Sequence, residues 1–152
     1  MVYITKMIDT AALIPLIVVI FTVIVFFAVK PRAYYSEKHP VIDEIRSRIS
    51  KISPAFSKIP IRTGKKSYTE DKQLITLCIQ NPDSGDYYDI NVLMYVALHE
   101  LSHCITKADG KESHGTEFKG NFSTLLKEAA KKGVYDPRQP IPETYCGVNS
   151  DT

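Results

Sequence analysis

The pentapeptide His99-Glu100-Leu101-Ser102-His103 combines the residue types of a metal-dependent hydrolase at the spacing that this chemistry needs. Histidines four positions apart lie on one face of a helix, with Cβ atoms roughly 5–6 Å apart, so both imidazoles can bind one ion. Glu100 is rotated off that face, which suits a general base acting on water better than a metal ligand. In the alternative, a core helix with two hydrogen-bonded histidines, Glu100 would be a costly near-buried carboxylate without a task. The pattern therefore favours a metal centre with Glu100 as its base.

A catalytic zinc site needs a third protein ligand and keeps its fourth position for water. His114 is the main candidate, because three of the four histidines of the chain fall between residues 99 and 114. The polar segment 107–113, with Gly110 as its turn residue, would let the chain reverse and bring His114 back. Three nearby acidic residues are alternative ligands: Asp109, Glu112 and Glu117.

Two helices are predicted to carry these side chains. The first covers 90–105, is apolar apart from the motif, and has Asp89 or Asn91 as its N-cap. An almost wholly apolar helix is typical of a buried central position. The second shows apolar residues at helical spacing from Phe118 to Ala130 and ends before Gly133. His114 should therefore lie at the start of a second helix that packs against the first.

The remaining segments predict a small α+β domain. A helix is expected over 41–52, and a strand over Leu74–Gln80, where Ile75, Leu77 and Ile79 share one face. An earlier strand near residues 59–62 or 67–68 should pair with it. The segment after Gly133 is rich in proline and is expected to be irregular; Tyr135 or Tyr145 there could stabilise an oxyanion, but packing is the simpler role.

The segment HELSH, ten further residues and then His114-Gly115-Thr116-Glu117-Phe118 resembles the HExxH…HGxxF signature of the WLM and SprT-like minimal zincins. It is most similar to short membrane-anchored versions predicted in large DNA viruses, and it departs from the shorter histidine spacing of metzincins. The resemblance covers about residues 67–146. It implies a minimal zincin-like domain, with a short sheet, a metal-binding helix and a second packed helix.

The resemblance also implies a function. His99, His103 and His114 would bind Zn²⁺, and Glu100 would be the catalytic residue of a metallopeptidase that hydrolyses protein or peptide substrates. Relatives include proteases that act on DNA-bound or ubiquitin-like-conjugated proteins. By analogy with zincins, an edge strand beside the site would align the substrate by backbone pairing, and Leu74–Gln80 is the candidate.

Residues 11–29 form an apolar run of nineteen residues, which as a helix would extend about 28 Å, near the roughly 30 Å hydrocarbon core of a bilayer. The sequence thus predicts a tail (1–10), a transmembrane helix (11–29), a basic juxtamembrane segment with a short helix (30–66) and the zincin-like domain (67–152). The alternative, a cleaved signal peptide, lacks a convincing cleavage site.

Charge is distributed unevenly along the chain. Residues 30–66 carry ten Lys/Arg against three Asp/Glu, whereas residues 67–152 carry eight against thirteen. The positive-inside rule then predicts a single-pass protein with its C-terminal domain on the cytoplasmic side. The viral resemblance implies that the membrane is that of the host or the virion, with the domain on the cytoplasmic or virion-interior side. The basic segment could contact anionic lipid or be a solvated linker. Nucleic acid is an unlikely partner, because the segment lacks interleaved aromatic residues or a known binding module.

The three cysteines, Cys78, Cys104 and Cys146, predict no disulfide framework and suggest a reducing compartment. Cys104 is expected in the core and Cys146 as an incidental loop thiol. Together these features predict a membrane-anchored zinc metallopeptidase. The alternatives are a membrane-anchored structural or virion protein that retains a zinc site without activity, and a nucleic-acid-associated adaptor.

Overall fold

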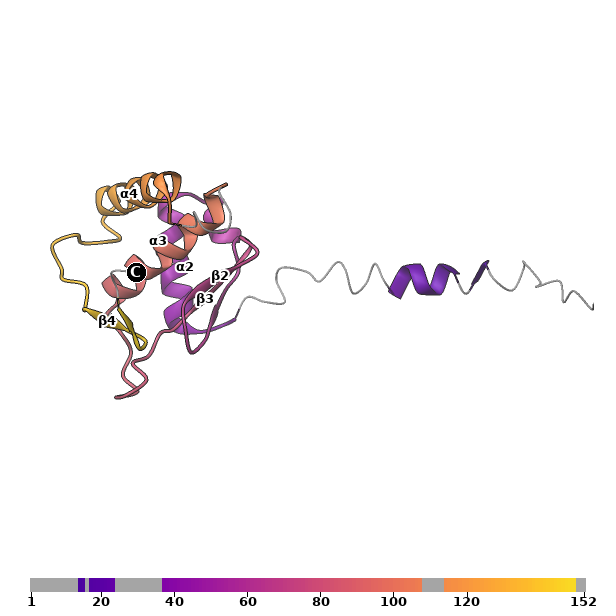
Figure 1. Ribbon diagram of the computed structural model, residues 1–152, viewed down its shortest axis with the longest axis horizontal. Helices are drawn as coiled ribbons and strands as arrows, with labels where there is room; N and C mark the ends of the chain where they lie inside the picture. The colour runs from indigo at the N-terminus through magenta and orange to yellow at the C-terminus, as the bar shows by residue number, and fades with distance from the viewer. Residues whose placement is uncertain (1–13, 16, 24–36, 108–113, 150–152) are drawn as a thin grey trace, which may run out of the picture. The chain divides into compact units, whose positions relative to one another are not determined.

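The computed structural model describes residues 14–15, 17–23, 37–107 and 114–149, and the chain divides into two compact units, Met1–Pro31 and Arg32–Thr152 (Figure 1). The second unit begins with helix α2 (Pro40–Ile52), followed by a short 3₁₀ helix, η2 (Phe56–Lys58). His39 caps α2 by accepting a hydrogen bond from the Val41 amide, and Pro40 stands in the first turn, where no amide donor is needed. Because α2 buries an isoleucine stripe in the core, residues 40–52 are part of the folded domain.

A three-stranded sheet follows, with β1 (Ile61–Thr63), β2 (Tyr68–Glu70) and β3 (Leu74–Leu77) in the order β1-β3-β2. β1 runs parallel to β3, and β2 runs antiparallel to it. β3 is thus the central strand and is buried at all four positions. The strand predicted over Leu74–Gln80 is therefore shorter than expected. It is also not an edge strand, because segments on both sides of it pair with it.

Helix α3 (Ile90–Ile105) carries the pentapeptide and packs against α2, α4, β2 and β3. Figure 1 shows it between α4 on one side and β2 and β3 on the other. The Asp89 side chain accepts a hydrogen bond from the Asn91 amide at 2.7 Å and so caps the helix. This central position buries most of the helix and explains why its sequence is apolar on nearly every side.

Helix α4 (Thr116–Lys131) begins after Gly115 and buries Phe118, Leu125 and Ala129. It ends at Lys131, and its C-cap Lys132 is followed by Gly133 with a φ of +65°, a conformation that glycine adopts without steric cost. Both predicted helices thus have the ends that their capping residues indicate.

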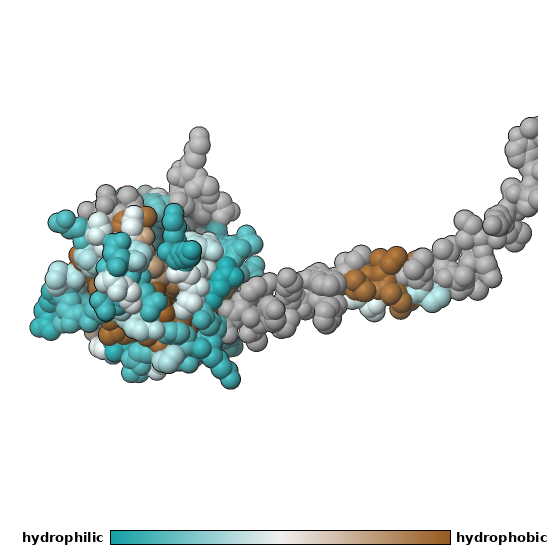
Figure 2. Space-filling model, turned by 90° about the horizontal axis from the view of Figure 1, so that it is seen from below, coloured by the Kyte–Doolittle hydropathy of each residue, from teal (hydrophilic) through white to brown (hydrophobic). Residues whose placement is uncertain are grey.

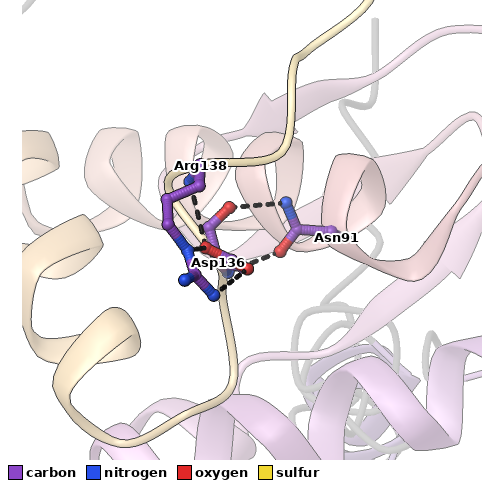
Figure 3. Close-up of polar contacts among 3 residues, drawn as sticks. All are labelled: Asn91, Asp136 and Arg138. Atoms are coloured by element: carbon purple, nitrogen blue, oxygen red, sulfur yellow. Dashed lines mark hydrogen bonds and ion pairs between the residues drawn. The ribbon is translucent and has the colours of Figure 1, made fainter.

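The segment after α4 returns to the start of α3. Asn91 makes two hydrogen bonds to the backbone of Asp136, donating to its carbonyl oxygen at 3.0 Å and accepting from its amide at 2.7 Å (Figure 3). Arg138 in turn donates to the Asp136 carboxylate, which lowers the pKa of that group to about 2. These contacts attach the C-terminal segment to the N-terminal end of the helix that carries the motif.

A hairpin of two short strands, β4 (Thr144–Tyr145) and β5 (Val148–Asn149), follows. It shows that the prediction of no disulfide is wrong. Cys146 forms a disulfide with Cys78, which follows β3; their Cα atoms are 6.4 Å apart across 68 residues of sequence. The Tyr145 hydroxyl donates to the Cys78 carbonyl oxygen and so holds the hairpin against β3. Cys146 is therefore a half-cystine with a structural role, and Cys104 remains a free thiol.

The prediction of a transmembrane helix over residues 11–29, and with it the single-pass membrane localisation, is also wrong. Among the residues that the structure describes, no helix is both long and apolar enough to cross a bilayer. Of the run, residues 11–13, 16 and 24–29 lie outside the described residues, and residues 17–23 form a described helical stretch. Its apolar side chains are exposed (Figure 2). High hydropathy was the basis of the prediction, and hydropathy alone does not establish a helix that spans a membrane.

Candidate metal centre

Helix α3 and the turn before α4 bring three histidines together. The Nε2 atom of His114 lies 3.2 Å from Nε2 of His99 and 3.1 Å from Nε2 of His103. The three ligand nitrogens all lie within 4.8 Å of one another. His99 and His103 share a face of α3 through their spacing, and His114 reaches them because α4 packs against α3. The three histidines singled out in the sequence thus form a cluster that could hold a metal ion.

The distances fit a bound ion better than hydrogen bonds among the rings. A tetrahedral ion held at about 2.0–2.1 Å places its ligand nitrogens about 3.3–3.4 Å apart, close to the separations seen here. A neutral imidazole, by contrast, carries one N–H, so His114 Nε2 cannot donate to both neighbours at once. Three nitrogens that converge on one point are a suitable donor set for a metal.

Burial keeps these imidazoles in the form that binds metal. It is the main cause that lowers the pKa of His99 to about 4, with His103 and His114 adding to the effect. Burial likewise lowers the pKa of His103 to about 4, assisted by His114 and by the Lys72 ammonium. At neutral pH both rings are therefore uncharged, and a neutral imidazole is the metal ligand.

Phe118 on α4 forms the apolar wall behind the cluster. Its ring centroid lies 4.4 Å from that of His103, 4.8 Å from that of His114 and 4.9 Å from that of His99, and the side chain is only 3% exposed. Phe122 packs against His99 at 5.3 Å. The two phenylalanines appear in the sequence as part of an apolar helix face, and periodicity alone did not reveal that they contact the histidines.

Glu100, the predicted base, is buried on α3, with 6% of its surface exposed. The hydroxyl of Thr69 on β2 donates to its Oε2 atom at 2.9 Å. Burial raises the pKa of Glu100 to about 7, and the hydrogen bond from Thr69 opposes that rise. A carboxyl group with such a pKa can accept and release a proton near neutral pH. Thr69 was not identified from the sequence, because no motif links it to a residue 31 positions away.

The alternative ligands and tyrosines are placed differently or not described. Asp109 and Glu112 lie outside the described residues. Glu117 accepts a hydrogen bond from the Lys107 amide at 3.2 Å.

The two tyrosines proposed for an oxyanion have packing roles. The Tyr145 hydroxyl is hydrogen-bonded to the Cys78 carbonyl oxygen and to the Ser67 hydroxyl, and the Tyr135 ring packs against Tyr95. Burial raises the pKa of the Cys104 thiol to about 11, so the thiol is protonated at neutral pH.

A cavity of about 530 Å³ lies apart from the histidine cluster. It is lined by residues at the start of α3, at the end of α4 and in the loop 134–139. The motif residues do not line it. Its charged side chains include Arg138 and Asp136, which pair with each other. We therefore assign the candidate site to the histidine cluster and not to this cavity.

The pKa of Glu100 predicts an unusual pH dependence of stability in the metal-free protein. A folded-state pKa of about 7, above the ordinary value of 4.5, means that folding favours the protonated carboxyl. The stabilisation from Glu100 is thus present below about pH 4.5 and is lost as the pH rises toward 7. Glu100→Gln cannot titrate. The free energy of unfolding of Glu100→Gln minus that of wild type, measured by urea denaturation, should therefore increase between pH 5 and pH 8 by at most about 3 kcal/mol. An unchanged difference would contradict the raised pKa.

The chain is similar to uncharacterized proteins of large DNA viruses. It is 39% identical over 93 residues to a protein of Invertebrate iridescent virus 3, covering 61% of this chain and 57% of the relative. A protein of Invertebrate iridescent virus 6 is also 39% identical over 93 residues, covering 60% of this chain and 51% of that protein. A protein of Acanthamoeba polyphaga mimivirus is 34% identical over 121 residues, covering 77% of this chain and 58% of that protein.

The chain thus spans a little over half the length of these relatives. Their viral origin agrees with the viral resemblance read from the motif. No protein-family model matches the chain, and no solved structure matches it. A zincin family is therefore not identified by these comparisons.

Proposed function

We propose that this chain is a zinc-dependent peptidase, in which His99, His103 and His114 hold the metal and Glu100 is the catalytic residue. The observation that carries the proposal is the convergence of three Nε2 atoms: that of His114 lies 3.2 Å and 3.1 Å from those of His99 and His103, which stand on a helix that also carries the buried Glu100. The likeness of the motif to WLM and SprT-like zincins supports the same assignment.

Zinc is the metal that this donor set suits best. Three imidazole nitrogens against an apolar aromatic wall are typical ligands of a catalytic zinc, which leaves one position open. When bound, zinc supplies Lewis-acid activation of water and of the scissile carbonyl. The described residues offer these three nitrogens as a group, and the nearby Glu117 is bonded to a backbone amide.

Glu100 supplies the proton transfers of peptide hydrolysis. As a carboxylate it accepts a proton from the attacking water, and as a carboxylic acid it gives that proton to the departing amine. A group serves both steps best when its pKa lies near the working pH, and burial moves the pKa of Glu100 to about 7. A bound cation nearby would favour the carboxylate and so extend its activity to lower pH.

The substrate would pair with β2 instead of the strand expected from the sequence. β2 is an outer strand of the sheet, contacts α3, and carries Thr69 against Glu100. An extended peptide can add to such an edge through backbone hydrogen bonds, which places it beside the helix that carries the metal ligands. This arrangement suits protein or peptide substrates with an extended segment.

A peptide-library assay tests the proposed function. The zinc-loaded full chain should cleave a subset of unstructured peptides, detected by mass spectrometry of the products, and removal of the metal with a chelator should abolish cleavage. Zinc restored in excess of the chelator should recover it. A zinc-loaded protein that cleaves no peptide would refute a peptidase and would favour a structural role for the metal site.

A further inference from the structure

The hydroxyl of Thr69 lies against two oxygens of Glu100. It is 2.9 Å from the side-chain Oε2 and 2.8 Å from the backbone carbonyl oxygen of the same residue. Glu100 is 6% exposed, so water contributes little to its solvation. Within the described part of the chain, Thr69 is the side chain that hydrogen-bonds to this carboxylate.

The sheet fixes where that hydroxyl lies. Thr69 pairs with Ile75 in the antiparallel β2–β3 ladder, and alternate residues of a strand point to opposite faces. Tyr68 and Glu70 are exposed and both accept hydrogen bonds from Arg62, at 3.3 Å and 3.1 Å, whereas Thr69 is half-buried against α3. Backbone pairing therefore places the Thr69 side chain, and its hydroxyl is not carried by a free loop.

Two acceptors for one hydroxyl proton have a chemical consequence. A threonine hydroxyl carries one proton, so it donates either to Oε2 or to the carbonyl oxygen as its main acceptor. Donation to Oε2 restrains one oxygen of an ionised carboxylate and leaves the other to accept a proton.

We propose that Thr69 is a positioning residue for Glu100: its hydroxyl, 2.9 Å from Oε2 and 2.8 Å from the backbone carbonyl oxygen, fixes the orientation of the carboxylate. The inference rests on the proposed function of Glu100 and adds a residue from a different element of the fold. With this role for Thr69, β2 would both pair with a peptide substrate and orient the Glu100 carboxylate.

The kinetic test compares Thr69→Val, which keeps the shape without the hydroxyl, with Thr69→Ser, which keeps the hydroxyl. In the zinc-loaded full chain, Thr69→Val should lower kcat about tenfold or more while KM and zinc content change by less than about twofold. Thr69→Ser should recover most of the lost kcat. Thr124→Val is the control, because the Thr124 hydroxyl donates to the Gly120 carbonyl on the exposed side of α4; its kcat should equal that of wild type.

A second readout needs no activity. In the metal-free protein, Thr69→Val should lower the melting temperature by about 4 °C, and by clearly less when Glu100 is already alanine. Equal losses in the two backgrounds would show that the hydroxyl and the carboxylate are not coupled and would overturn the inference. So would a Thr69→Val protein with the kcat of wild type, or a Thr69→Ser protein as slow as Thr69→Val.

The outcomes separate this inference from the proposed function. If wild type hydrolyses a peptide and Thr69→Val hydrolyses it at the same rate, the positioning role alone is overturned. Wild type that hydrolyses no peptide would overturn the proposed function, and the positioning role with it.

Discussion

Glu100→Gln should leave the fold and the zinc in place but lower kcat for peptide hydrolysis by about 10²–10⁴-fold or more. Glutamine keeps the shape of the side chain and can accept the hydrogen bond that Thr69 donates at 2.9 Å, but it cannot take a proton from water. General acid–base catalysis contributes about that range of rate, and Glu100 would serve both the acceptance and the return of the proton. Steady-state kinetics on a cleaved peptide, with zinc content measured in parallel, would check the expectation.

Glu143→Gln is the matched control, because this exposed glutamate lies outside the histidine cluster and its replacement removes the same charge. It should retain the activity of wild type. If Glu100→Gln hydrolysed the peptide as fast as wild type, Glu100 would not be the base, and the mechanism given above would be wrong.

The second large effect is expected from the metal ligands. His99→Ala/His103→Ala should carry almost no zinc, whereas wild type should carry close to one zinc per chain. The double variant should also gain no stability from zinc, since an ion that binds the folded state stabilises it by mass action. Elemental analysis of the purified full chain and thermal unfolding with and without zinc would measure both effects.

His39→Ala provides the control for these variants. His39 caps α2 and contacts Tyr87, and it is the one histidine of the chain outside the cluster. Its replacement should leave zinc content unchanged. His114→Ala should weaken zinc binding strongly, and stoichiometric zinc in the double variant would show that the ion binds elsewhere.

The helices and the histidine cluster could be predicted because their signals are local. Asp89 marks the start of α3 and Gly133 the end of α4, and the four-residue spacing places His99 and His103 on one face. His114 followed from the short, polar connection between two helices that must pack together. These predictions needed no knowledge of which distant segments meet.

The sheet and the support of Glu100 depend on contacts between distant segments. The strands of three and four residues are too short for a clear alternation, and the parallel pairing of β1 with β3 is not specified by any turn. The sequence therefore did not distinguish the central strand from an edge. Thr69 reaches Glu100 only after β2 has paired, so its role could not be seen from spacing.

The disulfide was missed for a similar reason. Two half-cystines need Cα atoms within about 7 Å, and here the end of β3 meets the C-terminal hairpin across 68 residues. The prediction of a transmembrane helix over residues 11–29 failed differently, because it rested on hydropathy alone.

Crystals of the zinc-loaded full chain, measured at the zinc absorption edge, would show whether the three histidines bind the ion. We expect one strong anomalous peak about 2.0–2.1 Å from Nε2 of His99, His103 and His114, with no fourth protein ligand. A zinc ion coordinated without His114, or a peak away from the three histidines, would contradict this expectation.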